Sequence, residues 1–258
     1  MHEGITDYLK IMNLAGVSEL KKTADSKRQT AEDSAALRSP VPSSLPSAVC
    51  RPPSAPAPSP EYRINGALTK VDQLRRLADE VAQCTLCHEL ASSRKQTVFG
   101  VGNSDSPLVF LGEAPGADED RQGEPFVGRA GQLLTDIITK GMKLRREDVY
   151  ICNVLRCRPP GNRNPMPDEA AHCRPFLDRT LEIIEPKFIC CLGAVAAKNL
   201  LASEQTIGAL RGRIWNYKEI KVICTYHPAY LLRNPAAKKE TWEDIQLLMR
   251  EMDNTLAQ

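Results

Sequence analysis

The clearest pattern in the chain is an alternation of short apolar runs with stretches in which apolar residues recur at helical spacing. The runs cover residues 107–112, 148–154, 187–193 and 220–226. Helical patterns begin near residues 128 and 168, end near 202, and begin again near 236. Strands that are apolar on both faces and alternate with helices indicate a parallel sheet that is covered on both sides.

A further helical repeat precedes the first apolar run. It is formed by Leu68, Val71, Leu74, Leu77 and Val81. The sequence therefore predicts one three-layer α/β/α domain with a central, mainly parallel sheet over residues 61–258. Such sheets bind ligands beyond the carboxyl ends of their strands. Here those ends lead into GEAPG (112–116), NVLRCRPPGNRNP (153–165) and TYHPAYLLRNP (225–235), which predicts a cleft between these loops.

The N-terminal part of the chain has a different composition. Residues 39–60 hold eight of the nineteen prolines together with six serines, a composition that indicates a semi-extended linker. The linker separates a short segment, residues 1–38, from the predicted domain. Two interpretations of residues 5–20 stay open: an amphipathic helix that docks on a repair or replication partner, and a frayed terminus without a role.

The composition and charge of the chain limit the classes of protein to which it can belong. The 258 residues are 42% hydrophobic, enough for a real core, and the formal net charge is only +2. A nucleic-acid partner would therefore have to meet a local basic surface. No apolar run is long enough to cross a membrane, and the N-terminus does not have the pattern of a secretory signal. We expect a cytoplasmic protein whose nine cysteines are thiols rather than disulfides.

Four of these cysteines have the spacing of a ligand set. Cys84 and Cys87 form a C-x2-C motif, Cys157 follows a strand-like run, and Cys173 lies sixteen residues further on. Because His88 follows Cys87, c-type haem attachment is one interpretation, but it leaves Cys157 and Cys173 without a role. Four thiolates suit either a zinc ion or a [4Fe–4S] cluster, and the number of ligands does not separate the two. The cysteines inside strand-like runs are expected to be buried and inert: Cys152, Cys190, Cys191 and Cys224.

From about residue 68 to 250, the ordered set of motifs resembles the family 4 uracil-DNA glycosylases, the iron–sulfur type. The motifs are CTLC (84–87), GEAPG (112–116), GEPFVG (123–128), NVLRCRPPGNRNP (153–165), CRPFL (173–177), LGA (192–194) and TYHPA (225–229). The resemblance implies an enzyme that flips uracil out of DNA and hydrolyses its N-glycosidic bond. The product would be an abasic site, the start of base-excision repair. It also implies a mainly structural [4Fe–4S] cluster on Cys84, Cys87, Cys157 and Cys173.

The resemblance assigns roles in uracil binding. Phe126 would stack on the extruded base. The Asn153 amide carries a donor and an acceptor that match uracil O4 and N3–H, whereas cytosine would mismatch it. His227 would donate a hydrogen bond to O2 as negative charge develops on the departing base. Backbone groups of the loop around Gly112 and Gly116 would approach the ring, because glycine has no side chain in the way.

The carboxylates are harder to assign. Better-known uracil glycosylases have an Asp and a Tyr in this loop, where Ala114 and Gly116 stand here. By resemblance, Glu119 would fill the space that excludes the methyl group of thymine, and Glu113 would order the loop or the attacking water. Asn162 would orient water or a phosphate. Asp120 is a lesser candidate.

Contacts with DNA are expected outside the GEAPG loop. Tyr230, Leu231 and Leu232 could wedge into the gap left by the flipped base. Arg163 and Arg233 are expected to contact phosphates. Further candidates of this kind are Arg158, Arg211, Arg213, Lys238 and Lys239. The expected partner is uracil-containing DNA, single- or double-stranded, bound by a monomer.

Two rival functions are weighed against the glycosylase. The first is a relative that binds uracil-DNA tightly or traps it covalently. Such relatives read GEQPG and carry a basic insertion ending in His, but Ala114 stands at the Gln position and the insertion is missing. The second is a non-catalytic, metal-stabilised DNA-binding or replication-accessory protein. Since no lysine lies at the predicted catalytic positions, we expect a monofunctional glycosylase that leaves the DNA strand intact.

Overall fold

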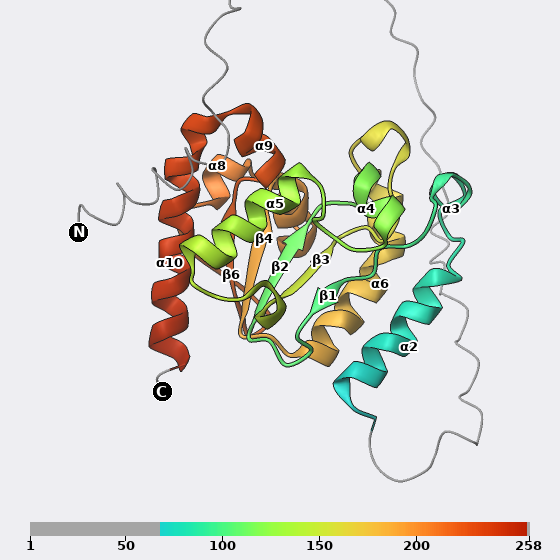
Figure 1. Ribbon diagram of the computed structural model, residues 1–258, viewed down its shortest axis with the longest axis horizontal. Helices are drawn as coiled ribbons and strands as arrows, with labels where there is room; N and C mark the ends of the chain where they lie inside the picture. Colours follow the sequence, from blue (N-terminus) through green and yellow to red (C-terminus); the bar gives the residue numbers. More distant parts are fainter. Residues whose placement is uncertain (1–67, 257–258) are drawn as a thin grey trace, which may run out of the picture. The chain divides into compact units, whose positions relative to one another are not determined.

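The computed structural model describes residues 68–256, which form an α/β fold around a single six-stranded sheet (Figure 1). The predicted segment 1–38 and the linker 39–60 lie outside the described residues. The strands are ordered β1-β3-β2-β4-β6-β5 across the sheet. Their bounds are Val101–Gly102 (β1), Leu108–Gly112 (β2), Tyr150–Asn153 (β3), Phe188–Leu192 (β4), Ile214–Tyr217 (β5) and Ile220–Thr225 (β6).

The four predicted strands are confirmed as the parallel centre of the sheet. Strand β2 pairs in parallel with β3 and β4, and β4 pairs in parallel with β6. The antiparallel edge strands β1 and β5 were not predicted. Strand β1 has only two residues, and β5 is at most half-buried. Neither has the continuous apolar character that marks a strand buried on both faces.

The predicted helices are present. They are α2 (Lys70–Ala82), α5 (Arg129–Asp136), α6 (Pro167–Ile184), α7 (Ala194–Leu201) and α10 (Lys238–Leu256). Four shorter helices were not predicted: α3 (His88–Ser93), α4 (Ala117–Gln122), α8 (Ile207–Leu210) and α9 (Pro228–Arg233). The short helices lie in loops, where too few residues repeat for helical periodicity to show.

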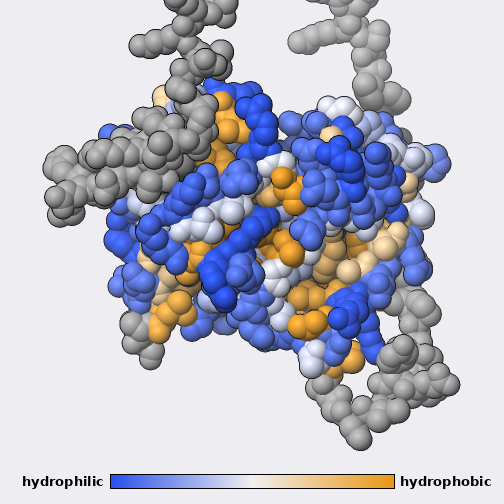
Figure 2. Space-filling view, in the orientation of Figure 1, coloured by the Kyte–Doolittle hydropathy of each residue, from blue (hydrophilic) through white to orange (hydrophobic). Residues whose placement is uncertain are grey.

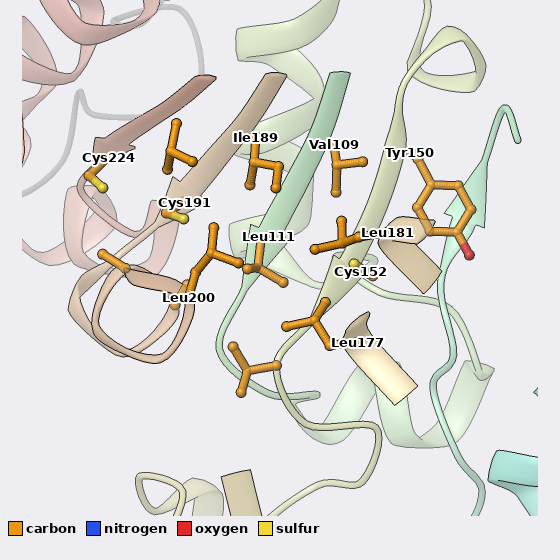
Figure 3. Close-up of a cluster of buried hydrophobic side chains, with 14 of the residues drawn as sticks. Val109, Leu111, Tyr150, Cys152, Leu177, Leu181, Ile189, Cys191, Leu200 and Cys224 are labelled. Atoms are coloured by element: carbon orange, nitrogen blue, oxygen red, sulfur yellow. The ribbon is translucent and has the colours of Figure 1, made fainter. Parts of the chain in front are cut away.

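Helices cover both faces of the sheet, which confirms the three-layer prediction. On one face, Leu177 and Leu181 of α6 and Leu200 of α7 meet strand residues such as Leu111 and Cys191 (Figure 3). On the other face, α10 approaches β6, and the Thr225 hydroxyl donates to Asp244 Oδ2 over 2.7 Å. Because successive strand residues point to opposite faces, each apolar run contributes to both layers of the core.

The cysteines that the sequence predicts to be buried in strands are fully buried. Cys152, Cys190, Cys191 and Cys224 each have 0% of their surface exposed. Burial raises the pKa of the Cys152, Cys190 and Cys191 thiols, which therefore stay protonated and pack as small apolar side chains.

On the face seen in Figure 2, hydrophobic residues form scattered patches among hydrophilic ones, as on most folded domains. Within residues 68–256, no helix is both long and apolar enough to span a bilayer.

Candidate active site

A cavity of about 390 Å³ lies at the carboxyl ends of the parallel strands, between the three predicted loops. The structure brings most of the predicted site residues together around it. Those that line the cavity are Glu113, Gly116, Glu119, Phe126, Asn153, Asn162, Arg163, His227 and Arg233. The cavity lies where an α/β sheet of this topology places a ligand.

Gly112, the last residue of β2, makes the close packing at the cavity floor feasible. A Cβ atom there would lie 2.3 Å from Asn153 Oδ1 and 2.6 Å from the Phe126 ring. Both distances are too short for any side chain. The missing side chain of Gly112 therefore lets the Asn153 amide and the Phe126 ring share one corner of the cavity.

Asn153 ends β3 with its side chain buried to 2% exposure. Its Oδ1 is enclosed and has no hydrogen-bond partner among the described residues. A buried acceptor without a partner costs about 1–3 kcal/mol, so native proteins seldom keep one without a reason. Asn153 also lines the cavity, which makes its amide a candidate partner for a bound molecule.

His227 precedes α9 as its N-cap, and its orientation follows from one hydrogen bond. The Ala229 backbone N–H donates to His227 Nδ1 over 3.1 Å. Nδ1 must therefore carry a lone pair, which leaves the proton of the neutral ring on Nε2. Burial lowers the pKa of His227 to about 4, and the charge of Arg233 contributes in the same direction. The imidazole is a neutral donor at physiological pH.

Phe126 lies beside His227 in the cavity wall, with 5.6 Å between the ring centroids and 31° between the planes. Its backbone φ of +56° is unusual for a residue with a side chain. Arg146 holds this conformation, because its Nη2 donates to the carbonyls of Pro125 and Phe126 over 2.9 and 3.1 Å. No sequence motif distinguishes Arg146 from its neighbour Arg145, so its role is visible only in the tertiary structure.

The two predicted carboxylates have different surroundings. Glu119 accepts hydrogen bonds from three backbone amides: Oε2 from Gly116 over 3.1 Å, and Oε1 from Val127 and Gly128 over 3.0 Å each. It therefore joins the start of α4 to the loop that carries Phe126. Glu113 is half-buried, and burial raises the pKa of its carboxyl group.

The remaining polar candidates have partners within the chain. Asn162 has a left-handed backbone with φ of +55°, and its Oδ1 accepts from Arg158 Nε over 2.7 Å. Asp120 is buried, and its Oδ1 accepts from the Lys95 backbone N–H over 2.9 Å. Both contacts stabilise loop structure at the edge of the cavity.

The residues of helix α9 that were expected to contact DNA differ in their exposure to solvent. Tyr230 and Leu232 are 36% and 39% exposed, whereas Leu231 is fully buried. The expectation that Leu231 wedges into DNA does not agree with this burial, because on a single turn of helix only one side can face the core. Arg233, at the end of α9, lines the cavity.

The four predicted ligand cysteines converge beside the cavity. Cys157 and Cys173 are buried in one cluster with Leu90 and Leu155, and Cys87 and Ala114 pack against it. Burial, together with the charges of Cys173, Cys157, Glu169 and Cys84, raises the pKa of Cys87 to about 12. A set of crowded, mutually repelling thiolates needs positive charge, which a bound metal would supply.

Arg94 belongs to this cysteine site. Its Nη1 donates to Cys157 Sγ over 3.0 Å, and its Nη2 donates to the carbonyls of Ala82 and Cys84. On the other side, Cys87 Sγ lies 3.4 Å from His172 Nδ1. Among residues 68–256, no three acidic, His or Cys side chains are spaced to hold a single metal ion.

Comparisons with known proteins show which family this fold belongs to. The family model described as the uracil DNA glycosylase superfamily matches residues 99–246. The chain belongs to this superfamily.

Within the superfamily, the chain is similar to type-4 uracil-DNA glycosylases, as the motifs predicted. It is 45% identical to the one from Archaeoglobus fulgidus over an alignment of 184 positions, which covers 68% of this chain and 92% of that protein. It is 44% identical to the Saccharolobus solfataricus enzyme, over 68% of this chain and 85% of the relative. The Thermotoga maritima enzyme is also 44% identical, over 69% of this chain and 94% of the relative.

Proposed function

We propose that this protein is a monofunctional uracil-DNA glycosylase, a hydrolase of N-glycosyl bonds. It removes uracil from DNA and leaves an abasic site, which starts base-excision repair. The observation that carries the proposal is the cavity at the carboxyl ends of the strands, which is lined by Asn153, Phe126 and His227. The identity of 45% to a type-4 uracil-DNA glycosylase supports it.

Asn153 distinguishes uracil from cytosine. Its Oδ1 accepts the uracil N3–H, and its Nδ2 donates to O4. Cytosine has a lone pair at N3 and an amino group at C4, so both contacts would set like against like. Each mismatched buried group costs about 1–3 kcal/mol. Phe126 provides the flat face on which the flipped base stacks, worth about 1–3 kcal/mol for such contacts.

His227 stabilises the leaving base. Breaking the N1–C1′ bond leaves positive charge on the sugar and negative charge on uracil, shared between N1 and O2. The neutral His227 ring donates its Nε2–H toward O2, while the Ala229 amide on Nδ1 keeps that tautomer. A donor that is already oriented and partly desolvated needs no rearrangement when the charge appears.

The two carboxylates are proposed to order the attacking water and to fix the shape of the cavity wall. Glu113, half-buried at the cavity wall, is the group proposed to order the attacking water. Because both oxygens of Glu119 are occupied by backbone amides, this side chain is a fixed part of the wall. A fixed wall resists displacement by the extra methyl group of thymine, the exclusion role proposed for Glu119. Asn162 is proposed to orient water at the loop after the cysteine site.

DNA is held by α9 and its surroundings. The exposed Tyr230 and Leu232 are proposed to enter the gap left by the flipped nucleotide. Arg233 is proposed to neutralise a phosphate beside the cavity mouth, which makes binding weaken as salt rises. Single- and double-stranded uracil-containing DNA are both proposed substrates.

Cys84, Cys87, Cys157 and Cys173 are proposed to hold a [4Fe–4S] cluster. Zinc is the less favoured alternative, because no three of these side chains are spaced to hold a single ion. The cluster supplies a cross-link between the helical segment around Cys84, the loop after Asn153, and α6. Arg94 donates to the Cys157 sulfur and so offsets thiolate charge. Iron and acid-labile sulfide analysis of the purified protein, with a broad brown absorbance, distinguishes the cluster from zinc.

We further propose that the protein acts as a monomer in the cytoplasm, on nucleoid DNA. Residues 1–60 are proposed to contact a repair or replication partner. Sedimentation with and without uracil-DNA tests the first statement. A comparison of the full chain with a chain starting at residue 61, in pull-downs from cell extract, tests the second.

The activity is tested by incubating the purified protein with uracil-containing oligonucleotides, single- and double-stranded, and then with alkali. Cleavage at the uracil position only after alkali is expected; strands that stay intact would reject the proposal. Cleavage before alkali would indicate a lyase. A protein–DNA band that survives denaturing electrophoresis would instead support a covalently trapping relative. DNA binding without excision by the wild-type protein would favour an accessory binding protein.

A further inference from the structure

Arg163 lies in the loop between Cys157 and α6 and makes a two-sided ion-pair network. Its Nη1 donates to Glu169 Oε2 over 2.9 Å, and its Nη2 donates to Glu169 Oε1 over 2.6 Å. The same Nη2 also donates to Glu89 Oε2 over 2.7 Å. The pair with Glu169 is bidentate, the geometry in which Arg binds a carboxylate most specifically.

The two partners of Arg163 belong to the segments that carry the cysteines. Glu89 is in α3, two residues after Cys87. Glu169 is in the first turn of α6, four residues before Cys173, and its Oε2 also accepts from the Met166 backbone N–H. The Arg163 guanidinium thus joins its own loop and the start of α6 to α3, where Glu89 lies 74 residues earlier in the chain.

The same loop forms part of the cavity wall. Asn162, Arg163 and Asn164 all line the cavity. Gly161 and Asn162 both have left-handed backbones, with φ of +64° and +55°. Glycine adopts this conformation at little cost, whereas Asn162 needs support from the surrounding structure to keep it. The network around Arg163 supplies such support from the adjacent residue.

The positive charge of Arg163 is already paired with carboxylates of the protein itself. Hydrogen bonds to Glu169 and Glu89 raise the pKa of Arg163, and the hydrogen bond from Arg163 lowers the pKa of Glu169. Only 27% of the Arg163 side chain is exposed. A guanidinium that already faces two carboxylates gains little from a phosphate, because the carboxylates repel the phosphate.

We propose that Arg163 is a positioning residue rather than a phosphate contact: it fastens the loop of residues 158–164 to α3 and α6, and so holds Asn162 at the cavity wall. This inference rests on the proposed uracil excision. It assigns a second role to Glu89 and Glu169, which connect the cysteine-bearing segments to the active-site loop. It also replaces the expectation that Arg163 binds DNA directly.

The experiment compares Arg163→Gln, Arg163→Lys and Glu89→Gln in single-turnover uracil excision and in DNA binding at several salt concentrations. Displacing a group at the site by about 1 Å costs up to about 100-fold in rate, so we expect Arg163→Gln to slow excision at least about tenfold. Lysine cannot form the bidentate fork, so Arg163→Lys should be nearly as slow. Glu89→Gln should also slow excision, by a smaller factor. DNA affinity and its salt slope should stay unchanged.

If Arg163 instead contacted a DNA phosphate directly, the variants would change DNA binding. Glu89→Gln would free Arg163 and tighten DNA binding, and Arg163→Gln would weaken DNA binding and reduce the salt slope by about one. Any of these results would overturn the inference. Unchanged excision in Arg163→Gln would overturn it as well.

Two controls separate positioning from folding. Arg179→Gln removes another Arg–Glu pair of α6, in which Arg179 Nη1 donates to both Glu80 oxygens, and should leave excision unchanged. Melting temperature and iron content should match the wild type in Glu89→Gln, whose carboxylate is 61% exposed. Loss of iron in proportion to activity would assign Arg163 a folding role instead. A wild-type protein that fails to excise uracil would reject the proposed function itself, which the variants do not test.

Discussion

The two ends of the sheet each carry a cavity, and the larger one is not the candidate site. The cavity at the amino end, lined by residues such as Lys187, Lys218 and Lys221, has a volume of about 640 Å³. The cavity at the carboxyl end has about 390 Å³. Size alone would select the wrong end.

The two cavities differ in whether their polar groups already have hydrogen-bond or ion-pair partners within the protein. At the amino end, Lys221 Nζ lies 2.9 Å from Glu251, and Lys218 Nζ lies 3.7 Å from Glu182. At the carboxyl end, a buried Asn153 oxygen lacks a partner among the described residues, and the His227 pKa is lowered to about 4. A binding site keeps polar groups ready for a ligand at a cost in stability, whereas an ordinary surface cavity satisfies its own charges.

His227→Ala gives the sharpest test of this contrast. Removing a donor aimed at developing negative charge typically costs about 10²–10³-fold in rate. We expect a loss of this size in single-turnover excision, with DNA binding retained. The matched change at the other end of the sheet, Lys218→Ala, should leave the rate within about twofold of wild type, as for a surface substitution remote from the site. An equal loss of excision rate in both variants would mean that the two cavities do not differ in function.

Gly112→Ala tests the close packing of the cavity floor. The new methyl group would lie 2.3 Å from Asn153 Oδ1 and 2.6 Å from the Phe126 ring, so both must move. Displacement of this kind can cost about 100-fold in excision rate. Gly208→Ala is the control, since its nearest neighbour would be 4.0 Å away. The control should keep wild-type activity; a tolerant Gly112→Ala would mean that the corner is not part of the site.

Asn153→Leu separates function from stability. Leu has a similar shape but no polar atoms, so it removes the unsatisfied oxygen. Loss of a matched hydrogen-bonding group of about 1–3 kcal/mol should slow excision roughly 5–150-fold. Urea unfolding should show equal or higher stability, because a buried unpaired polar atom is gone. A large loss of stability instead would mean that Asn153 has a structural partner.

The pH dependence of the excision rate is the smallest of the expected effects, because little should change near neutral pH. An imidazole with an ordinary pKa of about 6.5 would be mostly protonated at pH 5.5, whereas His227, with a pKa of about 4, stays neutral. Excision should therefore not fall with protonation of His227 until the pH approaches 4. Below that pH, a proton on Nδ1 would oppose the Ala229 N–H and displace the ring.

Glu113 can add a second acid limb to this profile, because burial raises the pKa of its carboxyl group. Its ionised form would be lost as the pH falls through that raised pKa, before His227 titrates. Comparing pH–rate profiles of wild type and Glu113→Gln separates the two: a limb that disappears in the variant belongs to Glu113. A limb near pH 6.5 in both proteins would contradict the lowered pKa of His227.

The sequence alone was enough for the parallel strands, the order of the loops and most of the residues around the cavity. Continuous apolar runs report burial on both faces, and the carboxyl ends of parallel strands must meet at one edge of the sheet. Asn153 and His227 were therefore predictable as neighbours, although they are 74 residues apart.

Other features depend on contacts that no local pattern encodes. Leu231 and Leu232 are adjacent and identical, yet only the fold decides that one is buried and the other exposed. Arg163 has the composition of a phosphate ligand, but Glu89, 74 residues earlier in the chain, is one of its partners. Side-chain pairing depends on distances in space, and a linear sequence records these only where periodicity or a known motif implies them.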